Sequence, residues 1–271
     1  MLKIFDVLIS LLMLINSFIY KLKVRVESSR FFYFFKPLDT DIYIASYMKS
    51  GTTLTQVMLF EILNKKNLDY SNINDVSPFL DTLIRRRNGF KILNRKEAPR
   101  LIKTHLHYNF LKTKIKGKVI YVQRDGMDVA WSQYHHIKSV YQPELTWKQH
   151  SQQFLDDSRS DSWFKHVKQW RTNKNKINIT YLQYEDVVTD LGAAAEKLAD
   201  FIGVELTEEQ KAQVVERCRF DRMKKEEKKY SPKPNFSNFI REGRTGSGKQ
   251  NFSDEQQQLF LHLSNKHFKN C

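Results

Sequence analysis

Short apolar runs alternate with longer amphipathic segments along this chain, and the alternation begins near residue 41. Residues 41–46 (DIYIAS) are rich in β-branched and aromatic side chains, which is typical of a buried strand. A polar turn with one glycine follows at residues 47–52 (YMKSGT), and residues 53–64 then repeat their apolar positions with the period of a helix. A strand, a glycine turn and a helix in this order form a unit that can bind phosphate at the helix N-terminus.

The same alternation continues into the C-terminal half of the chain. Further strands are predicted at residues 100–104, 118–123 and 177–182. Further helices are predicted at residues 127–141, 146–156, 163–173, 191–202 and 207–217. Strands that alternate with helices pair in parallel through crossover connections. The pattern therefore predicts one α/β domain with a central, mainly parallel sheet flanked by helices.

Polar residues mark where several of these helices begin and end. Two pairs have the spacing of a capping box and so predict helix starts: Thr207 with Gln210, and Ser253 with Gln256. Gly203 stands where the C-cap of a helix is expected. Residues 224–249 are rich in Lys, Pro and Gly and predict a long loop, and loops of this length are usually functional or disordered.

The composition fits a folded domain with an anionic partner. Of the 271 residues, 41% are hydrophobic and 13% are aromatic, which is enough for a buried core. The formal net charge of +15 favours nucleic acid, an acidic membrane surface or a multiply phosphorylated small molecule as partner, and a plain Lys-rich surface would give the same value. The two cysteines, Cys218 and Cys271, predict neither a structural disulfide nor a zinc finger.

Residues 1–25 are an apolar N-terminal segment that precedes the domain. Residues 4–20 are mostly apolar, but they are fewer than the roughly 20 residues that a membrane-spanning helix needs. They lack the small-residue cleavage site of a signal peptide. Lys21, Lys23 and Arg25 follow them, so insertion into a membrane would keep the domain cytoplasmic. Two interpretations stay open: membrane association on the cytoplasmic face through residues 4–20, or a helix packed against protein.

The first candidate site is the turn Lys49-Ser50-Gly51-Thr52-Thr53. The amides at the start of the following helix are unpaired, and together with the helix dipole they bind phosphate. Gly51 lets the backbone approach a ligand, and Lys49 can neutralise charge on a leaving phosphate oxygen. The GxxxxGK[ST] pattern of a Walker A loop is absent, which disfavours a P-loop kinase. A helix capped by Ser or Thr, with no ligand, is the alternative.

The second candidate site is Lys103-Thr104-His105, at the end of a predicted strand. In an open α/β sheet the carboxyl ends of the strands face the ligand. A histidine at that position can accept a proton from an attacking hydroxyl near neutral pH. An ordinary histidine at a strand end is the alternative. His107 makes an H-x-H pair with His105, but no third ligand is evident, so no metal site is predicted.

Two further candidate sites carry arginine. Arg124 follows a predicted strand and Ser132 comes eight residues later in a helix, so a guanidinium and a hydroxyl can bind one phosphate. An ion pair of Arg124 with Asp125 or Asp128 is the alternative. Residues 241–246 (REGRTG) place arginines and glycines in the long loop, where they can fold over an anion or form a solvated linker.

Together these motifs resemble those of the sulfotransferases that use 3′-phosphoadenosine 5′-phosphosulfate (PAPS), especially the cytosolic type with small-molecule substrates. The likeness covers residues 41–271, which it implies are a sulfotransferase domain, and the motifs keep the family's order. The matching segments are YMKSGTT at 47–53, RLIKTHL at 100–106, VIYVQRDGMDVAWSQYHH at 119–136, YLQYEDV at 181–187 and FIREGRTGSGK at 239–249.

The resemblance implies how the reaction is divided among the residues. Lys49 and the amides of residues 50–53 form a P-loop-like turn that holds the 5′-phosphosulfate. Lys103 neutralises the transferring sulfuryl group, and His105 is the general base on the acceptor. Lys49, Lys103 and His105 are therefore the expected catalytic residues, and transfer is expected to be direct and in line.

The resemblance also implies the contacts to the rest of the co-substrate. Arg124 and Ser132 bind the 3′-phosphate, assisted by Arg241 and the backbone at Gly243, and Tyr184 lies near the adenine. PAPS is the expected co-substrate, adenosine 3′,5′-bisphosphate (PAP) is the product, and no metal is expected. The acceptor is expected to be a small molecule with a hydroxyl or an amine. Its identity and the oligomeric state stay open.

Several positions depart from the family's pattern. Leu54 stands in place of a tryptophan that stacks on adenine, and Glu242 stands in place of a lysine. Cys218 stands where threonine is common. These differences predict weaker PAPS binding than is usual in the family. Residues 249–258 match the family's dimer motif poorly, so a dimer is not assumed.

A non-catalytic nucleotide-binding module of the same fold is the main alternative to an enzyme. Lys49 and His105 are both present, which favours the enzyme, because loss of either would favour the module. Nucleic-acid binding is not predicted. The basic residues are scattered, and no RRM signature, zinc finger or helix-turn-helix is evident.

Overall fold

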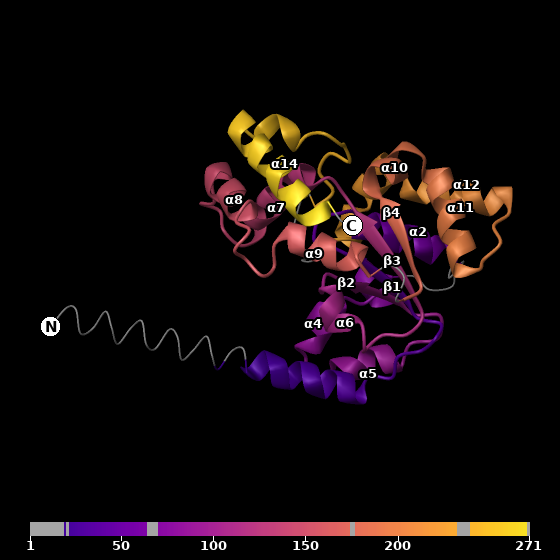
Figure 1. The fold of residues 1–271 in the computed structure, drawn as a ribbon. Helices are drawn as coiled ribbons and strands as arrows, with labels where there is room; N and C mark the ends of the chain where they lie inside the picture. The colour runs from indigo at the N-terminus through magenta and orange to yellow at the C-terminus, as the bar shows by residue number, and fades with distance from the viewer. Residues whose placement is uncertain (1–18, 20–21, 64–69, 174–176, 232–238, 270–271) are drawn as a thin grey trace.

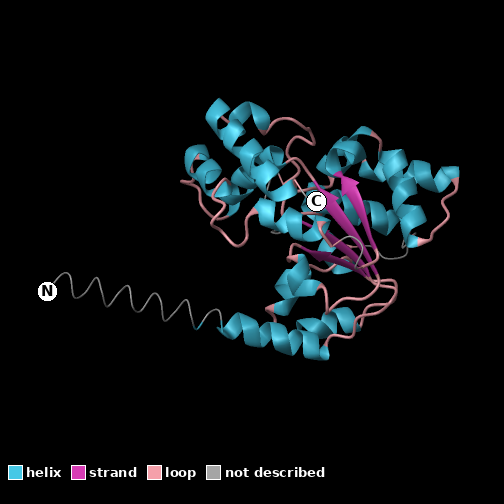
Figure 2. Cartoon of the chain, in the orientation of Figure 1, coloured by secondary structure: helices cyan, strands magenta, loops and turns pink. Residues whose placement is uncertain are grey.

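Four strands among the described residues pair in parallel and form the central sheet of the computed structural model (Figures 1 and 2). The structure describes all residues except 1–18, 20–21, 64–69, 174–176, 232–238 and 270–271. The strands are β1 (Ile42–Ser46), β2 (Leu101–Thr104), β3 (Lys118–Gln123) and β4 (Ile179–Gln183), in the spatial order β2-β1-β3-β4. Because all the pairings are parallel, the carboxyl ends of the strands meet at one edge of the sheet, and the predicted fold class is confirmed.

Helices surround the sheet on both faces (Figure 2). In chain order they are α2 (Thr52–Ile62), α3 (Ile73–Val76), α4 (Leu80–Ile84), α5 (Gly89–Asn94), α6 (Tyr108–Leu111), α7 (Gly126–Val140), α8 (Trp147–Phe154), α9 (Trp163–Arg171), α10 (Tyr184–Thr189), α11 (Leu191–Ile202), α12 (Glu208–Cys218), α13 (Phe220–Lys225) and α14 (Asp254–Phe268). Residues 22–34 are also helical. Two 3₁₀ helices are η2 (Glu227–Lys229) and η3 (Lys249–Asn251).

The two faces of the sheet bury different side chains, because successive residues of a strand point to opposite sides. Ile42 and Ile44 of β1 belong to a core cluster with side chains of α2, α11 and α12. Tyr43 and Ala45 belong to a second cluster, with side chains of α4, α5 and α6 and with Trp170 of α9. A third apolar cluster joins α7, α8, α9 and α14. The sheet is therefore covered on both faces, so a ligand site is expected at its carboxyl edge.

The predicted strands and long helices are confirmed, with ends that differ by at most two residues. Both predicted capping boxes are present, at the starts of α12 and α14. Gly203 ends α11 with a left-handed φ of 81°. The short helices α3, α4, α5, α6, α10 and α13 were not predicted, because four to six residues are too few to display a helical period.

The prediction of one long loop at residues 224–249 is wrong at its start. Helix α13 extends to Lys225 and η2 follows it, because Met223 and Tyr230 are buried in the core cluster of α2 and α12. Apolar side chains that reach this core give the segment regular structure in spite of its Lys-rich composition. Residues 239–248 are irregular, as predicted.

An aromatic helix precedes the sheet. Residues 22–34 form this helix, and Phe31 and Phe35 are buried in the second core cluster, against side chains of α4 to α6. Almost all of residues 4–20 lies outside the described residues, so the membrane and packed-helix interpretations both stay predictions. Among the residues that the structure describes, no helix has the length and apolar character needed to cross a membrane.

Candidate active site

A cavity of about 750 Å³ lies at the carboxyl edge of the sheet. The segment that follows each strand contributes to it: the turn after β1, His105 after β2, Arg124 after β3 and Tyr184 after β4. The predicted residues that line the cavity are Lys49, Gly51, Thr52, Thr53, Lys103, His105, Arg124, Ser132, Tyr184, Arg241 and Gly243. Ser50 is the exception, because it is buried and is not part of the lining.

The turn between β1 and α2 requires glycine at position 51. Gly51 has a left-handed φ of 102° and directly precedes the first residue of α2. A Cβ atom there would lie 2.4 Å from Cδ2 of Tyr184, so both the backbone conformation and the lack of space exclude a side chain. Lys49 also has a positive φ, of 67°. The turn brings the first residues of α2 to the cavity wall, where the unpaired amides and the helix dipole favour an anion.

Two lysines in the cavity have lowered pKa values. Burial, together with the nearby charges of Lys103, Arg124 and Arg241, lowers the pKa of Lys49 to about 7. Burial lowers the pKa of Lys103 to about 8, although the carboxylate of Asp81 acts in the opposite direction. Clustered positive groups disfavour each other's charged form, and an anion that binds among them relieves this repulsion. The cavity is therefore electrostatically suited to a ligand with several negative charges.

His105 is held in one orientation by backbone contacts. Its Nδ1 lies 2.9 Å from the carbonyl oxygen of Ser46. A carbonyl oxygen only accepts, so Nδ1 carries the proton and the lone pair is on Nε2. The amide of His105 donates to the carboxylate of Asp81 at 3.1 Å, and its carbonyl accepts from Nε2 of His166 at 3.1 Å. Burial and the charge of Lys103 hold the pKa of His105 well below its usual value. The imidazole is therefore neutral near pH 7 and can accept a proton on Nε2.

Asp81 of α4 is a site residue that the sequence pattern did not reveal. Its carboxylate accepts hydrogen bonds from Oγ1 of Thr104 at 2.9 Å and from the amide of His105. Burial raises the pKa of this carboxyl group, and the two hydrogen bonds oppose that rise. In the sequence, Asp81 could have been noticed as the single carboxylate within the mostly apolar run PFLDTLI at residues 78–84. Asp81 thus fixes the end of the strand that carries Lys103 and His105.

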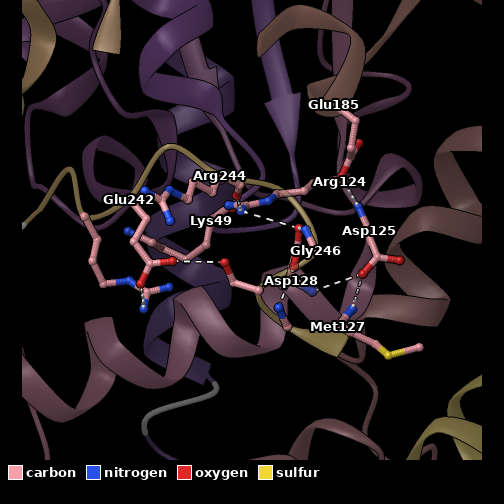
Figure 3. Close-up of polar contacts among 12 residues, drawn as sticks. Lys49, Arg124, Asp125, Met127, Asp128, Glu185, Glu242, Arg244 and Gly246 are labelled. Carbon is pink, nitrogen blue, oxygen red and sulfur yellow. Dashed lines mark hydrogen bonds and ion pairs between the residues drawn. The ribbon is translucent and has the colours of Figure 1, made fainter. Parts of the chain in front are cut away.

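Arg124 contacts both segments that border the cavity (Figure 3). Its Nη1 donates to the carbonyl of Lys49 at 3.3 Å, and its Nη2 donates to the carbonyl of Arg244 at 3.0 Å. The guanidinium lies 4.4 Å from the ring centroid of Tyr184. The ion pair with Asp128, the alternative interpretation, is also present at 3.8 Å, which is longer than a hydrogen bond. Arg124 therefore lies between the turn at residues 49–53 and the loop at residues 239–248, where its charge is only partly neutralised.

Apolar side chains line the cavity next to the core cluster of α2 and α12. They are Leu54, Leu191, Cys218 and Met223, and Phe220 joins them from the start of α13. Phe220 is 44% exposed, and its ring lies so close to Gly243 that a Cβ atom on this glycine would be 2.3 Å away. An apolar surface with an open ring beside cationic groups suits a nucleotide base.

Aromatic and histidine side chains line the cavity near His105. The ring of Phe79 lies 5.1 Å from the ring of His105, and His107 and His136 also belong to the lining. Burial and the nearby charges of two lysines lower the pKa of His136 to about 4. Within the described residues, no three His, Cys, Asp or Glu side chains are grouped so that they could hold a metal ion.

Comparisons with known proteins point to one family. Residues 39–271 match the family model for the sulfotransferase domain. Sulfotransferase 1A1 of Bos taurus is 34% identical over 243 residues, which cover 83% of this chain and 82% of that protein. Amine sulfotransferase of Oryctolagus cuniculus is 30% identical over 250 residues, which cover 83% of this chain and 80% of that protein.

Two solved structures of proteins in complex with PAP have a similar fold. A mouse sulfotransferase in complex with PAP superposes with a TM-score of 0.69 at 26% identity, and the match covers 87% of each chain. Retinol dehydratase in complex with retinol and PAP superposes with a TM-score of 0.74 at 24% identity, covering 86% of this chain and 83% of that one. At 24% identity, the similarity to retinol dehydratase shows a shared fold and nothing further.

Proposed function

We infer the chemistry of this cavity from the premise that the chain belongs to the PAPS-dependent sulfotransferase family, as the match over residues 39–271 shows. The chain transfers a sulfuryl group from PAPS to a small-molecule acceptor. We propose that the cavity at the carboxyl edge of the sheet is the site of this transfer. The observation that carries the proposal is that His105, Lys103 and the turn at 49–53 line one cavity although they come from separate segments of the chain.

In this proposal the 5′-phosphosulfate binds at the turn after β1. Lys49 and the amides of residues 50–53 hold it, and for Ser50 the backbone amide alone takes part, since its side chain is buried. The left-handed conformation of Gly51 and the start of α2 at Thr52 support this assignment. The lowered pKa of Lys49 supports it as well, because a neighbouring dianion would restore the charge of this ammonium.

The 3′-phosphate binds between α7 and the loop at residues 239–248. Arg124, Ser132 and Arg241 supply side-chain donors, and Gly243 supplies a backbone amide. All four residues line the cavity, and the hydrogen bond of Arg124 to the carbonyl of Arg244 brings this loop to the end of β3. A guanidinium binds phosphate through two parallel hydrogen bonds, which suits the role.

The adenine occupies the apolar lining. Leu54 lies where a stacking tryptophan would be expected, so the exposed ring of Phe220 takes over the stacking in this proposal. Tyr184 packs against Gly51 and beneath the guanidinium of Arg124, and it borders the adenine on the side of the phosphates. The proposal predicts that an adenine nucleotide buries part of the exposed surface of Phe220.

His105 acts as the general base in the transfer. Its Nε2 accepts the proton of the acceptor hydroxyl or amine while the acceptor atom bonds to sulfur and the bond from sulfur to the phosphate oxygen breaks. Lys103 lowers the negative charge on the transferring group. Lys49 and the helix amides stabilise the charge that develops on the leaving phosphate oxygen. The acceptor class that we propose is a phenol, an alcohol or an amine.

The proposal is tested by measuring PAP release from PAPS with phenol, alcohol and amine acceptors. We expect release that depends on the acceptor and is lost in His105→Ala, with Thr207→Ala, at the N-cap of α12 and outside the cavity lining, as a control. Thermal shifts with PAP, 5′-AMP and ATP should be largest for PAP. Sulfation that persists in both His105→Ala and Lys49→Ala would place the chemistry outside this cavity.

The cytoplasmic location also belongs to the proposal. It is supported by the basic residues Lys21, Lys23 and Arg25, which follow the apolar residues 4–20. Cell fractionation of the full chain and of a variant without residues 1–20 tests it, since that deletion leaves the helix at 22–34 intact. A membrane-bound fraction that disappears with the deletion would favour the membrane interpretation over the packed helix.

A further inference from the structure

A buried carboxylate fastens the loop at residues 239–248 to helix α7. Asp128 is 2% exposed, and its two oxygens accept hydrogen bonds from two loop amides, Gly246 at 2.8 Å and Gly248 at 2.6 Å (Figure 3). Gly248 lies directly against α7, because a Cβ atom there would be 2.2 Å from the backbone of Met127. Hydrogen bonds from amides to a carboxylate are stronger than bonds between neutral groups, so these contacts form a firm attachment.

The same segment is joined to the phosphate side of the cavity. Nη2 of Arg124 donates to the carbonyl of Arg244, two residues before the first amide that Asp128 binds. Arg124 also donates to the carbonyl of Lys49 in the phosphate turn. Residues 244–248 are therefore held at both ends next to the proposed 3′-phosphate site, and Arg244 belongs to the cavity lining.

The two arginines of this loop differ in their partners. Nη1 of Arg241 is 2.7 Å from Oε1 of Glu242, and the other oxygen of Glu242 accepts a hydrogen bond from Ser247 at 2.9 Å. Across the part of the chain that the structure describes, the guanidinium of Arg244 forms no comparable hydrogen bond or ion pair. Glu242 thus occupies one of the donors of Arg241 and leaves the others for a ligand, whereas all the donors of the Arg244 guanidinium remain available.

From this arrangement we propose that Arg244 is a further PAPS-binding residue, which donates to the 3′-phosphate, and that Asp128 is the positioning residue that holds it there. The inference rests on the proposed function of the cavity. Arg244 supplies the unpaired guanidinium that the loop lacks at Arg241, and the attachment by Asp128 keeps it beside Arg124. The specificity for a nucleotide with a 3′-phosphate then depends on Arg244 in addition to Arg124 and Arg241.

The decisive measurement compares PAP with 5′-AMP, which lacks the 3′-phosphate, by calorimetry. In Arg244→Ala the Kd for PAP should rise about tenfold to a hundredfold, as expected for loss of a hydrogen-bonded charge pair, while the Kd for 5′-AMP changes less than about twofold. Arg244→Lys should fall between the wild type and Arg244→Ala, because an ammonium lacks the fork of donors. Arg95→Ala removes an exposed arginine outside the cavity lining and should leave both values unchanged.

Two variants of the supporting residues sharpen the test. Asp128→Asn keeps the size of the side chain but offers a single acceptor oxygen, so amide exchange at residues 244–248 should accelerate and the preference for PAP over 5′-AMP should fall. Glu242→Gln frees Arg241, so the Kd for PAP should fall and the effect of Arg244→Ala should shrink in this background.

The outcomes separate this inference from the proposed function. If the wild type binds PAP no better than 5′-AMP, the 3′-phosphate site itself is wrong. If the wild type prefers PAP and Arg244→Ala keeps that preference within about twofold, the role of Arg244 is wrong and the proposed function stands. Unchanged amide exchange in Asp128→Asn would refute the positioning role. Arg244 is exposed, so its replacement leaves folding intact and this test applies whether or not Asp128→Asn folds.

Discussion

His105, the proposed base, and Arg124, the proposed phosphate ligand, share one cavity, but the protein holds them in different ways. His105 is fixed by the sheet and its edge, through the carbonyl of Ser46 at the end of β1 and the carboxylate of Asp81. Arg124 instead donates to carbonyls of a turn and a loop, and the loop depends on Asp128. A side chain that is fixed by adjacent strands is as rigid as the core. A side chain that is fixed by a loop depends on the contacts that hold the loop in place. We therefore expect changes at the base to alter kcat and changes at the loop to alter the KM for PAPS.

The largest effect is expected at the base. His105→Ala should lower kcat by about 10² to 10⁴-fold, because the acceptor loses the group that takes up its proton. The Kd for PAP should change little, since the proposed phosphate contacts remain. Single-turnover kinetics together with calorimetry measure the two quantities. A variant that kept more than about a tenth of the wild-type kcat would remove His105 from the mechanism.

The second-largest effect is expected for a change at Arg124, which contacts the loop at residues 239–248. Arg124→Ala should raise the Kd for PAP about tenfold to a hundredfold and lower the preference for PAP over 5′-AMP, because the 3′-phosphate loses a charged donor. At saturating PAPS, kcat should change much less than KM. If the variant kept the full preference for PAP over 5′-AMP, Arg124 would not bind the 3′-phosphate. If kcat fell by the same factor by which KM rises, the two regions would not act separately.

The two lysines predict a smaller effect that depends on pH. The pKa of Lys49 is about 7 in the free protein, because of burial and then of the nearby charges of Lys103, Arg124 and Arg241. Bound PAP favours the charged form and raises this pKa. Below about pH 7, Lys49 is charged in both the free and the PAP-bound protein. At higher pH, Lys49 of the free protein is mostly neutral, so the binding of PAP is accompanied by the uptake of a proton. The Kd therefore rises with pH above 7, by at most tenfold per pH unit for each proton taken up.

Calorimetry in two buffers with different ionisation enthalpies measures this proton uptake directly. In Lys49→Gln the rise of Kd should begin only near pH 8, where Lys103, whose pKa is about 8, starts to contribute. The titration of the 3′-phosphate group, with a second pKa near 6, lies below this range. Absence of proton uptake between pH 7 and 9 in the wild type would mean that neither lysine contacts the anion.

The smallest effect is expected far from both regions, at a helix cap. The hydroxyl of Thr207 accepts a hydrogen bond from the amide of Gln210 at the start of α12, and Gln210 closes the capping box. Thr207→Ala should lower the free energy of unfolding by about 1 kcal/mol without changing kcat or the KM for PAPS. Urea unfolding measures the loss. A change in either kinetic constant would show that the start of α12 affects the cavity, which its far end reaches at Cys218, and the comparison of the two regions does not anticipate this.

Much of this site could be read from the order of elements and polar residues along the chain. Lys49, His105 and Arg124 each follow a predicted strand, and the ends of parallel strands meet at one edge of a sheet. The capping box at Thr207 and the left-handed Gly203 depend on neighbours within four residues. Such features are local, and local features are visible in a linear sequence.

Other features depend on contacts between distant parts of the chain. The tautomer of His105 depends on a carbonyl 59 residues away, and the loop attachment depends on hydrogen bonds that span 118 and 120 residues. The lowered pKa values of Lys49 and Lys103 follow from burial, which no spacing pattern encodes. The sequence by itself determined which chemical groups would reach the carboxyl edge, because strand order and polarity place them there. Only the tertiary structure decided how each group is charged, oriented and paired, because those properties arise from neighbours that folding alone brings together.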